Sequence, residues 1–157
     1  MRIADTMITP PVTVPPGASA RQAARRMETE AVGCVLVAEH DTLHGIVTDR
    51  DLALRVLSTG TDPQTPVSEI MSVPVVTVDV ADELEAAYRA FRRAGVRRLP
   101  ILDGDRLVGL LTVDDLFLDV LHRLSDVLGP VSWSALRESN RRPGPGSTPA
   151  ETTWSAR

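Results

Sequence analysis

The sequence contains the same pattern twice, at a spacing of 64 residues. Residues 5–57 align with residues 69–121 without a gap, and about a third of the paired positions are identical. Each copy is short for a core of its own, so the two copies are expected to pack against each other about an approximate two-fold axis. A site that one copy carries is therefore expected in the other copy, unless its residues have changed.

Length and composition restrict the range of functions. The chain has 157 residues, of which 43% are hydrophobic, and no apolar run approaches the roughly 20 residues of a membrane span. All 17 basic residues are arginine, which excludes chemistry that needs a lysine. The net charge of −4 argues against nonspecific binding to nucleic acid or to an anionic membrane. Without an apolar signal segment at the N-terminus, a cytoplasmic location is expected.

Few residues are suited to catalysis or to metal binding. Cys34 is the only cysteine, so an intramolecular disulfide and a multi-cysteine zinc site are excluded. It lies in the apolar run 32–37, which is more typical of a buried side chain than of a reactive thiol. The three histidines do not have the spacing of a metal site, and no Ser-His-Asp arrangement is evident. We therefore expect no metal site and no enzymatic activity.

Each copy is expected to form an extended segment, a helix, two strands and a second helix, which indicates an α+β fold. Prolines keep residues 9–16 extended, and Asp82 with Glu85 predicts a capping box at the first helix of the second copy. The predicted strands and final helices are Cys34–Ala38, Leu43–Val47 and Arg50–Leu57 in the first copy, and Arg98–Leu102, Leu107–Leu111 and Asp114–Leu128 in the second.

These patterns divide the chain into four parts. The first repeat is expected over residues 1–57, a linker over 58–67 and the second repeat over 68–124. The extension 125–157 is predicted to be largely disordered, because its end is rich in Pro, Gly, Ser and Thr and has no apolar periodicity. Within it, residues 129–139 are expected either to dock as one helical turn or to fray.

A short motif follows the second strand of each copy. The pattern is Gly, two aliphatic residues, Thr, two variable residues and Asp, with Thr48 and Asp51 in the first copy and Thr112 and Asp115 in the second. One interpretation is helix capping alone, because a Thr at the cap position and an Asp three residues later satisfy free backbone groups. The other is a ligand site, because a carboxylate pairs with a ribose diol and a helix N-terminus with phosphate. In that case the glycine leaves room for a flat base.

Further features recur with these motifs: Met7 and Met71 precede each Val-Thr-Val, and a strand is predicted over residues 96–101. With its double copy, the chain resembles a tandem pair of cystathionine β-synthase (CBS) domains, a Bateman module of the stand-alone bacterial type. The resemblance covers residues 1 to about 124. It implies two βαββα repeats packed sheet to sheet with pseudo-two-fold symmetry, and two clefts that in this family often hold adenine nucleotides.

The resemblance also implies the roles of ten residues. The two aspartates would bind the ribose hydroxyls, and the threonines before them the ribose or the first phosphate. The backbone of each Thr-Val pair would edge the adenine, and two arginines would bind phosphate. The ribose-binding pairs are Thr48 with Asp51 and Thr112 with Asp115. The residues at the adenine are Thr13 and Val14, with Thr77 and Val78 in the second copy. The phosphate-binding arginines are Arg97 and Arg98.

The copies differ at the two arginines, because the first copy has Gly33 and Cys34 there. One cleft is therefore expected to bind more strongly, or to be the only one occupied. If the cleft of Asp115 receives Arg97 or Arg98, it is the stronger one. The alternative interpretation of the arginines is a solvated surface pair.

The function expected from the sequence is a regulatory module without enzymatic activity. It would bind an adenine nucleotide such as AMP, ADP or ATP, need no cofactor, and signal to an unidentified effector protein in trans. The alternative is a ligand-free module for dimerisation. A homodimer is expected in either case, through the apolar faces around Leu54, Leu57, Leu118 and Leu121.

Overall fold

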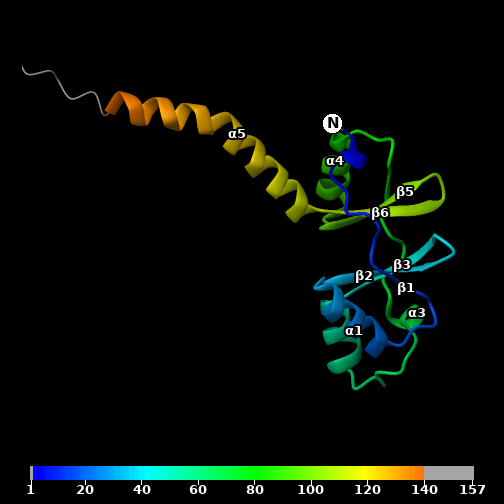
Figure 1. Ribbon diagram of the computed structural model, residues 1–157. Coiled ribbons are helices and arrows are strands. Elements are labelled where there is room, and N and C mark those ends of the chain that lie inside the picture. The colour runs from blue at the N-terminus through cyan, green and yellow to red at the C-terminus, as the bar shows by residue number, and fades with distance from the viewer. Residues whose placement is uncertain (1, 140–157) are drawn as a thin grey trace, which may run out of the picture. The chain divides into compact units, whose positions relative to one another are not determined.

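The computed structural model describes residues 2–139, and the side chains up to residue 129 (Figure 1). The first repeat contains η1 (Ile3–Asp5), β1 (Thr13–Val14), α1 (Ala20–Glu30), β2 (Cys34–Glu39), β3 (Thr42–Thr48), α2 (Asp49–Leu52) and the π-helix η2 (Ala53–Leu57). The second contains α3 (Val67–Ile70), β4 (Val78–Asp79), α4 (Leu84–Ala94), β5 (Arg98–Asp103), β6 (Arg106–Thr112) and α5 (Val113–Ser139). The predicted α+β fold of two repeats is confirmed.

Each repeat forms a three-stranded sheet with the same topology. The strand orders are β1-β2-β3 and β4-β5-β6, in which the first pair is parallel and the second antiparallel. The register also repeats, because Cys34 pairs with Thr48 and Arg98 with Thr112, 64 residues further on. β3 and β6 contact each other where the two sheets meet. Residues Met1–Asp119 form one compact unit that contains both sheets, and Val120–Arg157 form another.

The segment that leads into each repeat packs on the other repeat. Ile3 is fully buried in the core of the second sheet, with Leu99, Ile101 and Leu111 among its neighbours. Conversely, α3 contributes Val67 and Ile70 to the core of the first sheet, as part of the cluster Val14, Ala18, Ala20, Ala23, Met27, Val35, Val37, Val47 and Val56. The two repeats are thus interlocked at their leading segments, which brings residues of both to the same clefts.

The helix ends differ in part from the predictions. Ser19 caps α1 through a reciprocal pair of hydrogen bonds with Gln22. At α4 the predicted capping box is wrong, because Glu83 is the N-cap and the Asp82 carboxylate accepts a hydrogen bond from the Asp79 N–H at 3.2 Å. The final helix does not end at Leu128 but continues to Ser139, so the prediction of disorder does not hold over 125–139. Residues 140–157 lie outside the described part of the chain.

The part of α5 up to Leu128 has an apolar face. Apolar residues recur along α5 at positions 113, 117, 120, 121, 124, 127 and 128, which is the spacing of one face of a helix. Among residues 2–139, no helix combines the length and the apolar character needed to cross a bilayer.

Candidate functional site

Thr48 and Asp51 form a capping box where β3 ends and α2 begins. The Thr48 hydroxyl accepts a hydrogen bond from the Asp51 N–H at 3.1 Å, and Asp51 Oδ2 accepts from the Thr48 N–H at 2.9 Å and from its hydroxyl at 3.0 Å. Thr112 and Asp115 repeat the arrangement, with 3.1 Å to the Thr112 N–H and 2.6 Å to its hydroxyl. The capping interpretation therefore holds in both repeats. It does not exclude a ligand, because only one carboxylate oxygen of each aspartate accepts these bonds.

The glycines of the two motifs are covered by methionines. A Cβ on Gly45 would lie 2.5 Å from Met71 Sδ, and one on Gly109 would lie 2.7 Å from Met7 Sδ. The glycines thus make room for a methionine from the segment that leads into the other repeat. The expectation that they make room for a flat base is wrong.

A cleft of about 530 Å³ lies beside the Thr48–Asp51 pair, within the usual range for ligand sites. The first repeat lines it with Ile46, Thr48, Asp49, Arg50 and Asp51, and the second with Ser72, Pro74, Val75, Val76, Val96, Arg97 and Arg98. Its lining combines apolar side chains, among them Val75, Val76 and Val96, with carboxylates and guanidinium groups. The cleft therefore offers a surface for a flat apolar group next to groups that bind hydroxyls and anions.

Arg97 and Arg98 line the cleft of Asp51, so the condition under which the cleft of Asp115 was expected to be the stronger one is not met. The reason is the packing of the repeats, which brings Arg98 next to Gly33 and Asp49 of the first repeat. Arg98 Nη2 lies 3.2 Å from the point where a Cβ on Gly33 would stand. The missing side chain at Gly33 thus leaves space for an arginine from the other repeat.

Three arginines give the first cleft its positive charge. Arg97 forms an exposed ion pair with Asp114 at 3.1 Å. Arg50 and Arg98 form no ion pair within residues 2–139. Two guanidinium groups are therefore available to a phosphate, whereas Asp49 and Asp51 supply the acceptors.

The positions that would surround the Thr112–Asp115 pair in the same way carry different charges. Thr112 and Asp115 are kept, but Arg50 is replaced by Asp114, and Arg97 and Arg98 by Gly33 and Cys34. The local geometry of the motif is therefore duplicated, whereas the cations that would accompany a phosphate are not.

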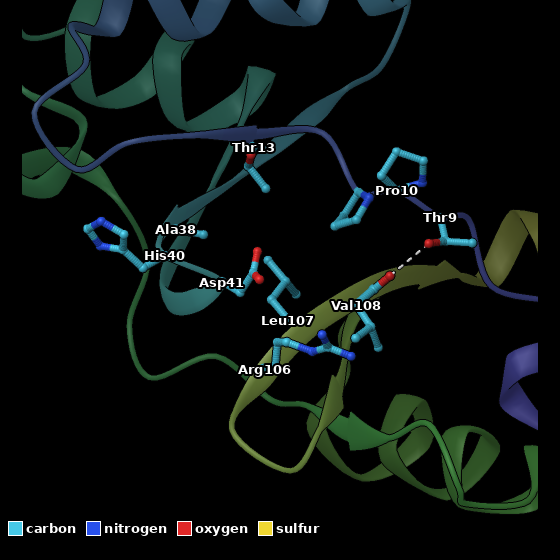
Figure 2. Close-up of a pocket in the computed structure, with 10 residues that line it drawn as sticks. Thr9, Pro10, Thr13, Ala38, His40, Asp41, Arg106, Leu107 and Val108 are labelled. Atoms are coloured by element: carbon cyan, nitrogen blue, oxygen red, sulfur yellow. Dashed lines mark hydrogen bonds between the residues drawn. The ribbon is translucent and has the colours of Figure 1, made fainter.

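Six of the ten predicted residues do not line the first cleft: Thr112 and Asp115 form the second motif, and four others lie elsewhere. Val14 is buried in the core of the first sheet, and Val78 is half-buried in β4. Thr13 lines a separate hollow of about 510 Å³ with Asp41 and Arg106, where Thr9 donates a hydrogen bond to the Val108 carbonyl at 2.9 Å (Figure 2). Thr77 lines the related hollow near Leu43 and Asp105.

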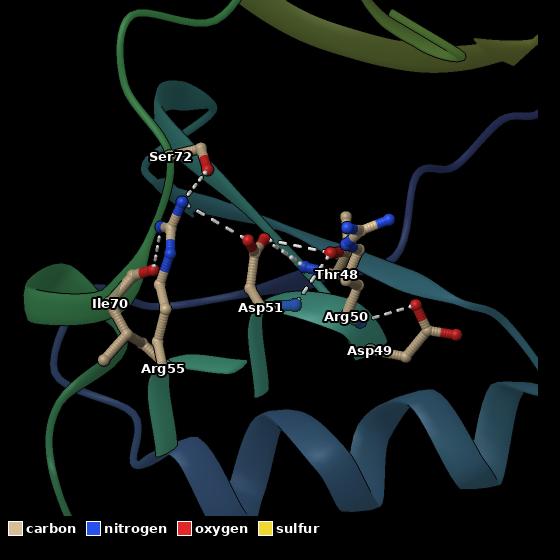
Figure 3. A network of polar contacts seen from close by, with 7 residues as sticks. All are labelled: Thr48, Asp49, Arg50, Asp51, Arg55, Ile70 and Ser72. Atoms are coloured by element: carbon tan, nitrogen blue, oxygen red, sulfur yellow. Dashed lines mark hydrogen bonds and ion pairs between the residues drawn. The ribbon is translucent and has the colours of Figure 1, made fainter. Parts of the chain in front are cut away.

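The structure also adds residues to those predicted. The apolar wall consists of Pro74, Val75 and Val76, just before the predicted pair Thr77 and Val78. Arg55 contacts the site from η2, as Figure 3 shows: its Nη2 lies 3.4 Å from Asp51 Oδ1. The repeat alignment could have drawn attention to Arg55, because the equivalent residue is Asp119.

Cys34 lies in β2 as a buried residue, 4% exposed. Burial raises the pKa of the Cys34 thiol, the guanidinium of Arg98 opposes this shift, and the carboxylate of Asp49 adds to it. A thiol that stays protonated is a weak nucleophile. Within residues 2–139, no three or more His, Cys, Asp or Glu side chains are placed to hold a metal ion.

Comparison with known proteins places these features in a family. The profile of the CBS domain matches residues 3–58 and again 67–122. The CBS domain-containing protein YhcV of Bacillus subtilis is 42% identical over 114 residues, which are 73% of this chain and 81% of YhcV. The CBS domain protein ATU1752 of Agrobacterium tumefaciens superposes with a TM-score of 0.66 at 25% identity, over 76% of this chain and 98% of that one.

One similar structure contains a nucleotide. The CBS domain protein PAE2072 of Pyrobaculum aerophilum, complexed with AMP, superposes with a TM-score of 0.67 at 25% identity, over 74% of this chain and 90% of that one.

Proposed function

Because the chain belongs to the CBS domain family and carries the domain twice, we propose that it is a regulatory module that binds an adenine nucleotide in the cleft of Asp51. The observation that carries the proposal is the combination, in one cleft, of the Thr48–Asp51 pair with two arginines that form no ion pair within residues 2–139. The AMP complex of PAE2072 supports the choice of ligand.

Each part of an adenine nucleotide has a matching surface in this cleft. Asp51 Oδ1 and the Thr48 hydroxyl suit the ribose diol, because a carboxylate accepts from two adjacent hydroxyl groups. The guanidinium groups of Arg50 and Arg98 suit a phosphate, to which they donate paired hydrogen bonds. Ile46, Val76 and Val96 offer an apolar surface for the base. We propose that these contacts serve binding rather than turnover.

Isothermal titration calorimetry with AMP, ADP, ATP, adenosine and GMP tests the proposal. The expected result is binding of at least one phosphorylated adenine nucleotide, with adenosine weaker because it lacks the phosphate. Arg98→Gln is expected to reduce affinity for the phosphorylated ligands roughly tenfold, the equivalent of one charge-assisted hydrogen bond. Arg93→Gln, on the exposed side of α4 and outside the cleft, is the matched control. No binding of any of these ligands would contradict the proposal.

We further propose that the protein forms a homodimer and signals to an effector protein in this form. The observation in favour is the exposure of large apolar residues on the final helix of each repeat: Leu54 and Leu57 are 53% and 78% exposed, and Leu118 is 53% exposed. Sedimentation of the protein and of Leu57→Glu tests this proposal. A dimer that the variant weakens is expected, and a monomer of 17 kDa at micromolar concentration would contradict it.

A further inference from the structure

Arg55 connects three groups around the first cleft. It lies in the middle of η2, and its guanidinium group donates from Nη1 to the Ile70 carbonyl at 2.6 Å and from Nη2 to the Ser72 hydroxyl at 3.0 Å. The same Nη2 lies 3.4 Å from Asp51 Oδ1. Figure 3 shows the side chain reaching across from η2 to both Asp51 and the segment 70–72. One residue thus ties the carboxylate of the site to a segment that comes from the other repeat.

The segment held by Arg55 leads directly into the apolar wall of the cleft. Ser72 lines the cleft and is paired with Ile46 of β3 through hydrogen bonds of 2.9 and 3.3 Å, and residues 74–76 follow it. Asp51, which Arg55 also contacts, has a side chain that is only 15% exposed. Fixing this segment and Asp51 before a ligand arrives lowers the ordering cost of binding.

The second repeat has no side chain that can make the same connection at the position equivalent to Arg55. The positions equivalent to Arg55, Ile70 and Ser72 are Asp119, Thr6 and Ile8, so an acid replaces the base and an alkyl group replaces the hydroxyl. The backbone differs too, because residues 117–121 continue the regular helix α5 where the first repeat forms the π-helix η2. π-Helical turns are rare in proteins, and those that do occur are often found at functional sites.

We propose that Arg55 is a positioning residue that pre-forms the first cleft and makes it the one that accepts the nucleotide. The inference rests on the proposed function, since it concerns how the same cleft is held. Arg55 acts through Asp51 and Ser72 and does not itself contact the ligand. A long side chain with several donors is required, because the three acceptors lie in different directions from the guanidinium group.

The test compares Arg55→Met, Arg55→Lys and Arg26→Met. Arg26 is the matched control, because it forms an i,i+4 ion pair with Glu30 at 3.0 Å and is 48% exposed against 45% for Arg55. Calorimetry with AMP is expected to show a loss of affinity of about tenfold or more for Arg55→Met, a partial loss for Arg55→Lys, and no change for Arg26→Met. Lysine restores the charge but cannot donate to all three acceptors in the same geometry.

Hydrogen exchange in the ligand-free protein gives a second readout. The Ser72 amide, which donates to the Ile46 carbonyl, is expected to exchange faster in Arg55→Met and at the wild-type rate in Arg26→Met. If Arg55→Met does not fold, Ser72→Ala is used in its place in both measurements, because it removes only one of the three contacts. Wild-type affinity in Arg55→Met, or an unchanged exchange rate, would overturn this inference and leave the proposed function intact. Absence of nucleotide binding by the wild-type protein would overturn both.

Discussion

Arg98 of the second repeat occupies the space left open by Gly33 of the first. Its Nη2 lies 3.2 Å from the point where a Cβ on Gly33 would stand, and Asp49 Oδ2 lies 3.3 Å from the same point. Gly33 is equivalent to Arg97 in the alignment of the repeats. Gly33 makes the first repeat appear to lack a cation. The same glycine leaves the space in which Arg98 of the second repeat reaches the cleft of Asp51.

A larger residue at position 33 is expected to displace Arg98. Gly33→Leu should weaken the binding of AMP about tenfold and leave the binding of adenosine nearly unchanged, because only the phosphate contact is lost. Calorimetry with both ligands on the same variant measures the difference. Gly17→Leu is the control, since a Cβ on Gly17 would meet nothing within 4 Å. Equal losses for AMP and adenosine would mean that position 33 affects the whole cleft rather than the phosphate.

The local features of the site could be predicted from the sequence, whereas its assembly from two repeats could not. The capping pairs follow from residues three apart, and the register of the sheets repeats because the copies align without a gap. An alignment of the repeats shows which residues are equivalent but not which lie close together. The sequence therefore left open which cleft receives Arg98.

Contacts between the repeats, which the alignment does not show, also determine which residues line the cleft and what the motif glycines contact. Residues 74–76 line the cleft, rather than Thr77 and Val78, because the segment enters from Ser72, which pairs with Ile46 of the other repeat. Gly45 accommodates Met71, 26 positions further along the chain, and no local pattern marks that contact. Both features depend on how the leading segment of one repeat packs on the other.

The two aspartates are expected to differ in their effect on binding. Asp51→Ala should weaken the binding of AMP by about tenfold or more, because it removes the carboxylate proposed to accept hydrogen bonds from the ribose hydroxyls in the cleft that also holds Arg50 and Arg98. Asp115→Ala should change the affinity little, because the positions equivalent to those arginines hold Asp114 and Cys34. Calorimetry with each variant tests this order.

Stability provides the control for this pair. Each substitution removes the same capping box, so each is expected to lower the free energy of unfolding by about 0.5–2 kcal/mol. Asp51→Ala also removes the ion pair with Arg55, so denaturant titrations should give it a loss at least as large as that of Asp115→Ala, with both losses within this range. A larger loss of AMP affinity in Asp115→Ala than in Asp51→Ala would show that the second cleft is the principal site.

The contact between Gly45 and Met71 is expected to be sensitive to a single methyl group. Gly45→Ala would place a Cβ 2.5 Å from Met71 Sδ and 2.8 Å from its Cγ, so the methionine or strand β3 must shift. We expect a loss of about 1–3 kcal/mol in the free energy of unfolding, as for other overpacked cores. Gly17→Ala, with open space around it, is the matched control and should change stability by less than about 1 kcal/mol. Similar denaturation midpoints for the two variants would contradict this prediction.

The buried thiol is expected to make stability fall at alkaline pH. Burial raises the pKa of Cys34 in the folded protein, so the folded state retains the thiol proton at a pH where the unfolded chain has lost it. Stability depends on pH through the difference in bound protons, and it decreases wherever the unfolded state binds fewer. The contribution is therefore complete below the pKa of the unfolded thiol, about 8.5, and is lost as the pH rises from there through the raised pKa of the folded state. Denaturant titrations between about pH 7 and 9.5 measure this slope, and Cys34→Ala, which has no titrating group at this position, should show a shallower one. Equal slopes for the two proteins would mean that the Cys34 thiol titrates alike in the folded and unfolded chains.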